Sequence, residues 1–387
     1  METKHLNLVI VALIALFATA YAEADWTTLD PPGATLTYAF DVSGGKIVGT
    51  YYDVSGIHGF LYDGTTWTSL DAPGVPVTHA FGIDGGNIVG CYGYDQWSGW
   101  HGFLYDGTTW TTLDAPGAYQ TLPYGIDGGN IAGYYAKQVE FVVEEHGFLY
   151  DGTTWTNVDA PGADRPFAYG IDGSNIVGSY LDGSGWHGYL YDGTSWTTLE
   201  YPGAYVTSAT DIDAGDIVGC YDDVSGTHGF LYDGTTWTSF DYPGTNWTWP
   251  LGIDGNKIVG YYRDSSGNDH GFLYTISVSA TVDVDPDTLN LKSKGKWITC
   301  YIELPEGYDV ADIDVSTIML NEQVAAESRP TGILDHDGDG IVELMVKFSR
   351  SGVQGILGTA DQAELTVTGE LADGAPFEGA DTIRVVQ

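Results

Sequence analysis

Basic residues are scarce in this chain of 387 residues, where 13 lysines and arginines stand against 53 aspartates and glutamates, giving a formal charge of −40 at pH 7. Nucleic acids and anionic membrane surfaces are bound through basic patches, so this balance argues against both as partners. Cysteine is also rare, with three residues in all, and an odd number leaves at least one unpaired. A disulfide framework is therefore excluded, and the stability of the fold must come from packing.

Long apolar runs are lacking after the first 22 residues. The chain opens with Lys4 and His5, continues with an apolar run over 8–18, and reaches the small-residue sequence Ala20-Tyr21-Ala22, a pattern typical of a secretory signal peptide. The run is too short to cross a bilayer core about 30 Å thick, which disfavours a membrane anchor. Residues 1–22 are therefore predicted to be a signal peptide, and the mature protein to be secreted, extracellular or cell-surface associated, without membrane insertion.

Glycine and aromatic residues are abundant, with 54 glycines, 12 tryptophans and 27 tyrosines, and they recur in a repeat. Six His-Gly-Phe-Leu-Tyr phrases, one with Tyr replacing Phe, lie 41 to 45 residues apart, a period typical of β-propeller blades. They begin at His58, His101, His146, His187, His228 and His270. Asp-Gly turns divide each repeat into four strand-like segments, which in the second repeat are 81–84, 87–92, 101–105 and 109–114.

A Trp-Thr phrase marks the fourth strand of each repeat, and its count indicates how the chain begins. It follows the first five histidine phrases but not His270, and the missing copy lies near the N-terminus at Trp26. The sequence therefore predicts an all-β fold in which 23–276 form a six-bladed β-propeller closed by its N-terminal strand. A linear solenoid is the alternative, but it would need capping repeats at both ends.

The phrases 79–84 (HAFGID), 87–90 (NIVG) and 58–62 (HGFLY) resemble the extracellular HAF-type repeats of secreted microbial proteins. The resemblance covers about residues 25–276 and recurs six times, although one copy alone reads His-Ala-Phe literally. It implies an exported or cell-surface protein and brings no activity with it.

Residues that recur in every repeat are more often needed by the blade than by a ligand. The six histidines lie on the third strand, roughly 10 Å from the innermost one, so they cannot share a metal ion, and each is expected to bond a neighbouring strand. Cys91 and Cys220 occupy the same place in repeats two and five, on opposite sides of a six-fold ring, and are predicted to be free buried thiols. A ring of turn residues is consistent either with a cation site or with ordinary Asp-Gly turns: Ser43, Asp84, Asp127, Asp172, Asp213 and Asp254.

The connections from fourth to first strand and from second to third strand emerge at one end of the blades, and here the repeats differ most. Aromatic residues gather at this variable end and are the candidate ligand-binding residues: Trp97, Trp100, Tyr119, Trp186, Trp247 and Trp249. They are expected either to stack on a ligand or to fold back over the blade ends. Asn246 begins an N-glycosylation sequon at the same end, and its occupancy depends on the host.

Residues 277–387 change character, with runs of period-two alternation that predict an Ig-like β-sandwich. Within them, a loop with regularly spaced carboxylates and a glycine at its sixth position is typical of Ca²⁺ binding. The predicted ligands are Asp335, Asp337, Asp339, Ile341 and Glu343. The role of the ion would be structural.

The preferred hypothesis is a secreted, non-enzymatic surface or matrix protein whose propeller binds an extracellular glycan or a surface protein. An enzyme acting on extracellular polysaccharide is one alternative, and a structural surface-layer component is another. The enzyme rests on fold analogy, since no Ser/His/Asp order or metal-hydrolase motif stands out from the repeats. Its candidate acids and bases would be Arg165, His79 and 144–145.

Overall fold

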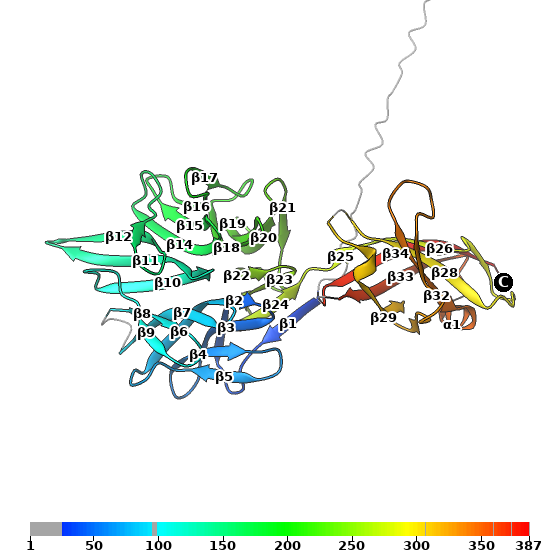
Figure 1. The fold of residues 1–387 in the computed structure, drawn as a ribbon, viewed down its shortest axis with the longest axis horizontal. Helices are drawn as coiled ribbons and strands as arrows, with labels where there is room; N and C mark the ends of the chain where they lie inside the picture. The colour runs from blue at the N-terminus through cyan, green and yellow to red at the C-terminus, as the bar shows by residue number, and fades with distance from the viewer. Residues whose placement is uncertain (1–24, 95–98, 306, 359, 373, 387) are drawn as a thin grey trace, which may run out of the picture. The chain divides into compact units, whose positions relative to one another are not determined.

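The computed structural model describes residues 25–94, 99–305, 307–358, 360–372 and 374–386. The predicted signal peptide therefore lies outside the described residues. Over these ranges the protein is all-β, with one short α-helix, α1 (Arg350–Ile356), and one 3-10 turn, Val310–Asp312. The chain divides between Ile276 and Ser277 into two compact units, and each is described by itself (Figure 1).

The unit Asp25–Ile276 is built from sets of four antiparallel strands, as the repeats predict. In the second repeat these are β6 (Val77–Asp84), β7 (Asn87–Gly93), β8 (His101–Tyr105) and β9 (Trp110–Thr112). The sets that follow the same order are β2 (Leu36–Ser43), β3 (Lys46–Tyr52), β4 (Ile57–Tyr62) and β5 (Trp67–Leu70); β10 (Gln120–Asp127), β11 (Asn130–Val139), β12 (Val142–Tyr150) and β13 (Trp155–Asn157); β14 (Arg165–Asp172), β15 (Asn175–Leu181), β16 (Trp186–Tyr191) and β17 (Trp196–Leu199); and β18 (Val206–Asp213), β19 (Asp216–Asp222), β20 (Thr227–Tyr232) and β21 (Trp237–Phe240). A parallel pairing of β4 with β6, through Ile57 and Val77, joins the first two sets into one eight-stranded sheet.

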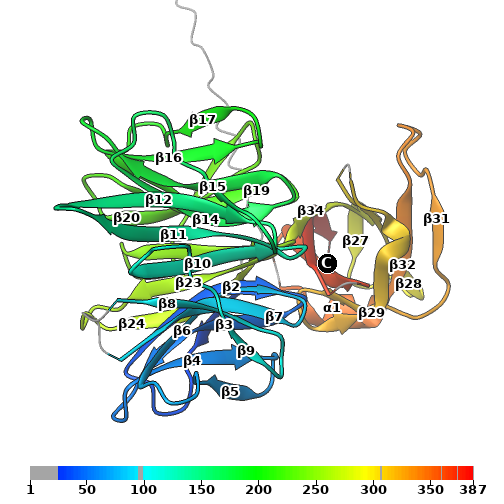
Figure 2. The same ribbon diagram turned by 60° about the vertical axis from the view of Figure 1, so that its left-hand side comes forward.

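The last set is completed by the N-terminal strand, as the phrase count predicts. β22 (Thr248–Asp254), β23 (Lys257–Arg263) and β24 (Asp269–Thr275) are followed in the sheet by β1 (Asp25–Leu29), which pairs antiparallel with β24. Trp26 on β1 packs against four rings of this set and its neighbour, those of Phe240, Tyr242, Phe272 and Tyr274. The first strands of successive sets contact one another, and β22 in turn contacts β2, so the contacts run in a circle. Figure 2 labels four of these first strands, β2, β6, β10 and β14.

The turns after the first strands are tight and link one set to the next. Gly44 and Gly45 have φ of 54° and 75°, which suits a two-residue hairpin turn. The turn carboxylates accept backbone N–H groups from a neighbouring set, as Asp84 Oδ2 does from Gly128 at 2.9 Å and Asp254 Oδ2 from Gly44 at 2.7 Å. Asp127 and Asp213 do the same toward Gly173 and Gly255. These aspartates therefore have a structural role in joining the sets.

The tryptophan of the Trp-Thr phrase packs between neighbouring sets. Trp110 lies 4.7 Å from Phe103, ring centroid to ring centroid, and belongs to a cluster that includes Val48 and Leu70 of the preceding set. Cys91 and Cys220 are buried and free, as predicted, and so is Cys300 in the C-terminal unit. One expectation was wrong. The sequence predicts a long loop over 136–145, between the second and third strands of the third repeat, yet this stretch forms a hairpin because β11 extends to Val139 and β12 begins at Val142.

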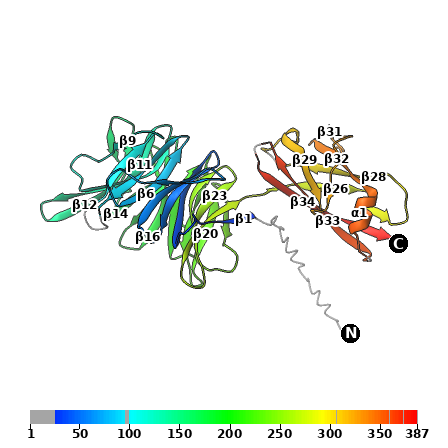
Figure 3. The same ribbon diagram turned by 90° about the horizontal axis from the view of Figure 1, so that it is seen from below.

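The C-terminal unit, which follows Ile276, contains two sheets (Figure 3). One has the order β25 (Val278–Ser279), β34 (Pro376–Val386), β33 (Gln362–Leu371), β29 (Ile313–Leu320) and β30 (Val324–Ala325), with β27 (Thr288–Asn290) also on β34; the other has the order β26 (Thr281–Asp285), β28 (Trp297–Glu303), β32 (Glu343–Ser349) and β31 (Gly332–Leu334). Buried residues of both sheets, such as Ile298, Phe348, Leu365 and Phe377, form one hydrophobic cluster. The two sheets therefore share a single core.

Candidate functional site

A cavity of about 380 Å³ lies between the first strands of the sets and is mostly aromatic. Alternation along these strands explains it, because residues such as His79 and Phe81 face the cavity while Thr78 and Ala80 are buried between sets. The aromatic lining residues are Tyr38, Phe40, Tyr52, Phe81, Tyr124, Tyr169, Trp249 and Tyr261, together with His79. A cavity of this size is in the range of small-molecule sites.

The cavity belongs to the variable end of the unit. Its lining residues Tyr38, His79 and Trp249 lie near the starts of their strands, and the recurring turns, which begin at Ser43, Asp84 and Asp254, lie at the opposite ends of those strands. The connections that differ between repeats therefore surround the cavity, and any ligand entering from that end would meet them first.

Two carboxylates, those of Asp41 and Asp211, lie at the base of the cavity. In the other four sets this position is a glycine, namely Gly82, Gly125, Gly170 and Gly252. The glycines leave space for the carboxylates, since a Cβ added to Gly252 would lie 2.7 Å from Asp41 Cα and one added to Gly170 would lie 2.5 Å from Asp211 Cα. The departure from glycine in two sets creates the polar floor.

Backbone N–H groups hold both carboxylates. Asp41 accepts from Val42 at 2.7 Å and, across to the next set, from Ile83 at 2.7 Å. Asp211 accepts from Ile253 of the next set at 2.8 Å. These bonds fix the position of each carboxylate relative to the adjoining strands, so the floor of the cavity is preorganised.

The surroundings disfavour the charged form of both acids. Protein encloses the two side chains, although each keeps part of its surface exposed to the cavities it lines. Burial, with the negative charge of Asp211 as the second cause, raises the pKa of Asp41 well above its usual range, and burial raises the pKa of Asp211 to about 7. Perturbed carboxyl groups in a cavity are candidates for a functional site.

The same two carboxylates line a second, smaller cavity of about 100 Å³ on the side of the Asp-Gly turns. Its other acidic residues are the turn aspartates Asp84, Asp127, Asp172, Asp213 and Asp254. Seven carboxylates therefore follow one another along the centre of the unit, from the floor of the aromatic cavity to the turns.

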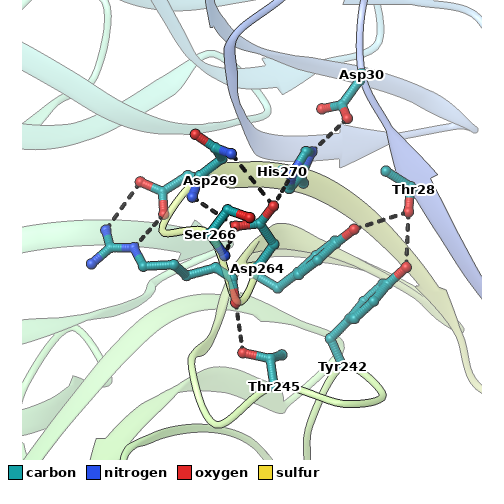
Figure 4. Close-up of polar contacts among 11 residues, drawn as sticks. Thr28, Asp30, Tyr242, Thr245, Asp264, Ser266, Asp269 and His270 are labelled. Carbon is teal, nitrogen blue, oxygen red and sulfur yellow. Dashed lines mark hydrogen bonds and ion pairs between the residues drawn. The ribbon is translucent and has the colours of Figure 1, made fainter.

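A cation is held beside the aromatic cavity but does not line it. Tyr38 donates to Asp269 Oδ2 at 2.8 Å. Asp269 also accepts two hydrogen bonds from Arg263, at 2.7 and 3.1 Å (Figure 4). Arg263 lies over the Trp247 ring, 4.6 Å from its centroid. The one basic side chain of the lining is His79, and burial lowers its pKa to about 4. The lining described for residues 25–94 and 99–276 therefore carries no positive charge at pH 7.

The candidate aromatic residues take different positions around this cavity. Trp249 is part of the lining, and Trp100 contacts His79 edge-on with ring centroids 5.1 Å apart. Trp186 packs against Phe167 at 5.9 Å. Tyr119 is 45% exposed, whereas the four candidate tryptophans that the structure describes are half-buried: Trp100, Trp186, Trp247 and Trp249. Trp97 lies outside the described residues. The structure thus brings Trp100 and Trp249 to the cavity and leaves Tyr119, Trp186 and Trp247 outside its lining.

Each of the six repeat histidines bonds a carboxylate one or two residues beyond the fourth strand of its own set, so its partner lies just past the end of the neighbouring strand that was expected to hold it. In each case His Nδ1 lies 2.7–3.0 Å from a carboxylate oxygen. The pairs are His58–Asp71, His101–Asp114, His146–Asp159, His187–Glu200, His228–Asp241 and His270–Asp30. The last pair ties the residue after β1 to β24 (Figure 4).

In three of these pairs the histidine also contacts a serine, an arrangement that was not predicted from the sequence. His58 Nε2 lies 2.9 Å from Ser55 Oγ, so Ser55, His58 and Asp71 form a chain like that of a hydrolase triad. However, Ser55 donates its hydroxyl proton to Asp53 Oδ1 at 2.6 Å, so the proton that a catalytic serine would give to its histidine is directed at another carboxylate. Ser184–His187–Glu200 and Ser225–His228–Asp241 repeat the arrangement, with Asp182 and Asp223 as acceptors. These chains brace the connection before β4, β16 and β20.

The predicted calcium loop brings three of its five residues together. Ligand oxygens of Asp335, Asp337 and Asp339 all lie within 4.8 Å of one another, on the exposed loop between β31 and β32. Glu343 is buried and accepts a hydrogen bond from the backbone N–H of His336 at 2.7 Å, so it fixes the first part of the loop. Three converging carboxylates are a suitable donor set for a hard divalent cation.

No protein-family model matches the sequence, and no curated protein matches it. Among solved structures, the chain is similar to the β-propeller domain of the Trilobed protease from Pyrococcus furiosus, with 10% identity, a TM-score of 0.39, and coverage of 62% of this chain and 94% of that one. TolB from Acinetobacter baumannii gives 14% identity, a TM-score of 0.41, and coverage of 60% of this chain and 64% of that one. The Hadza microbial sialidase Hz136 gives 14%, 0.44, and coverage of 63% and 66%. Likeness at this level carries no conclusion about activity.

Among the described residues, no helix has the length and apolar character needed to span a membrane.

Proposed function

We propose that this chain is a secreted, non-enzymatic surface or matrix protein whose unit Asp25–Ile276 is a binding module. The observation that carries the proposal is the aromatic cavity with a carboxylate floor at the variable end. A partner presented from outside, whether a glycan or a surface protein, would place a terminal group in this cavity. The surrounding connections, which differ from set to set, would contact the rest of the partner.

The architecture proposed with it is a six-bladed propeller of HAF-type repeats, closed by β1, followed by an Ig-like β-sandwich. The circle of contacts through β2, β6, β10, β14, β18 and β22 supports the propeller, and the shared core of two sheets supports the sandwich. A propeller concentrates one side chain from each blade at its centre, which suits a ligand that needs several rings around it.

Removing Trp249 is the test of this function. Trp249→Ala opens the cavity and deletes one of its rings, so binding to a glycan array is expected to fall at least about tenfold relative to the unchanged mature chain. Tyr205→Ala is the matched control, because Tyr205 lies in the connection before β18, is 66% exposed and does not line the cavity. Equal loss in both variants, or retention of binding in Trp249→Ala, would place the ligand elsewhere.

The enzyme alternative finds its strongest support in the serine–histidine chains, and their geometry weighs against it. Ser55 gives its proton to Asp53, and the arrangement recurs in three sets, where a single active site would need one. Of the predicted acids and bases, Arg165 pairs with Glu145 at 3.2 Å, and Glu144 pairs with Lys137 at 3.3 Å. These residues are committed to ion pairs within the hairpin and its neighbour.

A structural Ca²⁺ ion on the loop of the C-terminal unit is part of the same proposal, with Asp335, Asp337 and Asp339 as its ligands and Glu343 ordering the loop. We expect 1 mM Ca²⁺ to raise the thermal unfolding midpoint of that unit by several degrees relative to a chelator, because ligand binding to the folded state stabilises it. Scanning calorimetry measures the shift. Asp337→Asn should abolish it, and Asp361→Asn, an exposed acid of the same unit, should not. A midpoint indifferent to Ca²⁺ would remove the ion from the proposal.

A further inference from the structure

We propose that the aromatic cavity binds an organic ammonium ion, with its alkyl groups against the rings and its charge toward the carboxylates of Asp41 and Asp211. This inference rests on the proposed function above, since it names the chemical class of ligand for the same cavity. It follows from the charge of the floor, the composition of the walls and the volume available.

The charge along the centre of the unit is of one sign. Asp41 and Asp211 form the floor, and five further carboxylates line the smaller cavity beneath them. Arg263, the cation held nearby, is already paired with Asp269 by two hydrogen bonds. A cavity enclosed by protein strengthens the electrostatic field of these carboxylates, so entry is energetically favourable for a cation and unfavourable for an anion.

The walls favour a cation with an apolar body over a bare metal ion. Rings follow one another in contact around part of the cavity, with centroids of Phe40 and Phe81 4.9 Å apart, Phe81 and Tyr124 5.1 Å apart, and Tyr124 and Tyr169 5.1 Å apart. Aromatic faces attract ammonium groups through cation–π interactions, and alkylated ammonium ions also bury their methyl or methylene groups against the rings. A hard metal ion would instead need more oxygen ligands than the walls supply.

The walls also disfavour an uncharged sugar as the group that enters. Apart from the floor, the hydroxyl groups of Ser208, Thr210 and the tyrosines are the principal hydrogen-bonding groups of the lining. Tyr38 already donates its hydroxyl proton to Asp269, and Thr210 donates to the carbonyls of Val218 and Pro250. A sugar would leave most of its own hydroxyl groups without partners, which is costly in an apolar site.

The pattern across the sets agrees with a binding role for the floor. A glycine at this position is sufficient for the strand to pass close to its neighbour in four sets, so the fold does not require an acid there. Two acids that burial disfavours are retained at the one place where they face an aromatic cavity. A bound cation would offset the cost of their charge.

Calorimetric titration of the mature chain with matched probes tests the inference. Choline and 3,3-dimethylbutan-1-ol have nearly the same shape and differ in the charge of one atom, and we expect choline to bind at least about tenfold more tightly. Glucosamine against glucose asks whether the ammonium can come from an amino sugar instead of a free amine. Because these comparisons use the unchanged protein, they hold even if a substitution prevents folding.

Substitutions test whether the carboxylates of the cavity floor bind the ammonium group. Asp211→Asn and Asp41→Asn should each lower choline affinity at least about tenfold. Asp164→Asn is the matched control, because it removes one exposed carboxylate from a connection at the same end, outside the cavity, and it should leave affinity unchanged. Equal loss in Asp164→Asn would mean that only the net charge of the protein attracts the probe, which would overturn the inference.

The affinity of the protein for choline should also rise between pH 6 and pH 8, and a proton should be released on binding. The reason is that the cation binds the ionised form of the floor carboxylates more tightly than the protonated form. The groups facing Asp41 and Asp211 that could contribute to this titration are His79, Tyr38, Tyr52, Tyr124, Tyr169, Tyr261, Asp84, Asp127, Asp172, Asp213 and Asp254. His79 is neutral above its pKa of about 4, and the tyrosines whose pKa is resolved titrate well above 8. Burial raises the pKa of Asp211 to about 7, so Asp211 is the group expected to change its charge between pH 6 and pH 8.

The outcomes separate this inference from the proposed function. Equal binding of choline and its neutral analogue, or no binding of any ammonium probe, would overturn the ammonium assignment. A glycan signal that still depends on Trp249 would then leave the binding module standing with an uncharged ligand. Loss of both results would remove the cavity as a binding site altogether.

Discussion

Asp211→Asn is expected to make the protein more stable at pH 8 by about 2 kcal/mol. Burial raises the folded-state pKa of Asp211 to about 7, whereas the unfolded chain has the ordinary value near 3.8. A shift of about three units corresponds to about 4 kcal/mol, since each unit is 1.36 kcal/mol. The single amide oxygen of asparagine replaces a carboxylate that accepts from Ile253, and the cavity exposes part of the side chain to water, so roughly half of that figure remains.

The gain should depend on pH in a definite direction. Below about pH 3.8 the acid is protonated in both states and costs nothing, and the cost appears as the pH rises from there through about 7. Urea unfolding at pH 4 and pH 8, followed by tryptophan fluorescence, measures the difference; one tryptophan alone, Trp297, lies beyond residue 276. Asp164→Asn should change stability by less than about 0.5 kcal/mol at either pH. A gain of the same size at both values would mean that the buried charge is not its cause.

Trp26→Ala is expected to lower the stability of the unit Asp25–Ile276 by about 3 kcal/mol. Its ring contacts four others at centroid distances of 4.4–6.1 Å, and replacing a packed tryptophan by alanine costs about 3–5 kcal/mol when the surroundings cannot collapse. The lower end applies because Trp26 is half-buried. The loss tests whether the N-terminal strand is a full member of the last set.

The comparison that decides this is Trp67→Ala. Trp67 has the same place on β5 of the first set, with its ring 4.3 Å from Tyr62 and 5.1 Å from Phe60. If β1 is as firmly held as an internal strand, the two variants should lose stability equally within about 1 kcal/mol. A loss in Trp26→Ala much smaller than in Trp67→Ala would show that β1 frays from β24, and chemical denaturation of the two variants side by side distinguishes these results.

The strands and their pairing could be predicted because the repeat shows them six times over. The Asp-Gly turns, the alternation within each strand and the displaced Trp-Thr phrase at Trp26 were each visible in the sequence, and β1 pairs with β24 as they require. The hairpin of β11 and β12 was missed because 136–145 was interpreted as a connection longer than its counterparts, although Val139, Phe141 and Val142 at its tip have the apolar character of strand residues.

The floor of the cavity could have been found and was not. Asp41 and Asp211 are the two acids that replace the glycine found at this position in the other four sets, but among the acids of the repeats the recurring turn aspartates alone were considered. The signal was a substitution within the repeat, while the depth of the residue and its pKa depend on how six strands meet in space. Chains such as Ser55–His58–Asp71 could not be anticipated either, since they join residues whose proximity depends on strand register.

The pairing of β1 with β24 places the two ends of the unit Asp25–Ile276 at one point, with Asp25 directly opposite Thr275. The path along the chain therefore enters and leaves this unit through adjacent residues. Joining those ends with a short linker and opening the chain at another connection would keep every sheet intact, so the unit is suited to circular permutation. For the same reason it could be carried as an insertion within a surface loop of an unrelated host protein, at little cost to either fold.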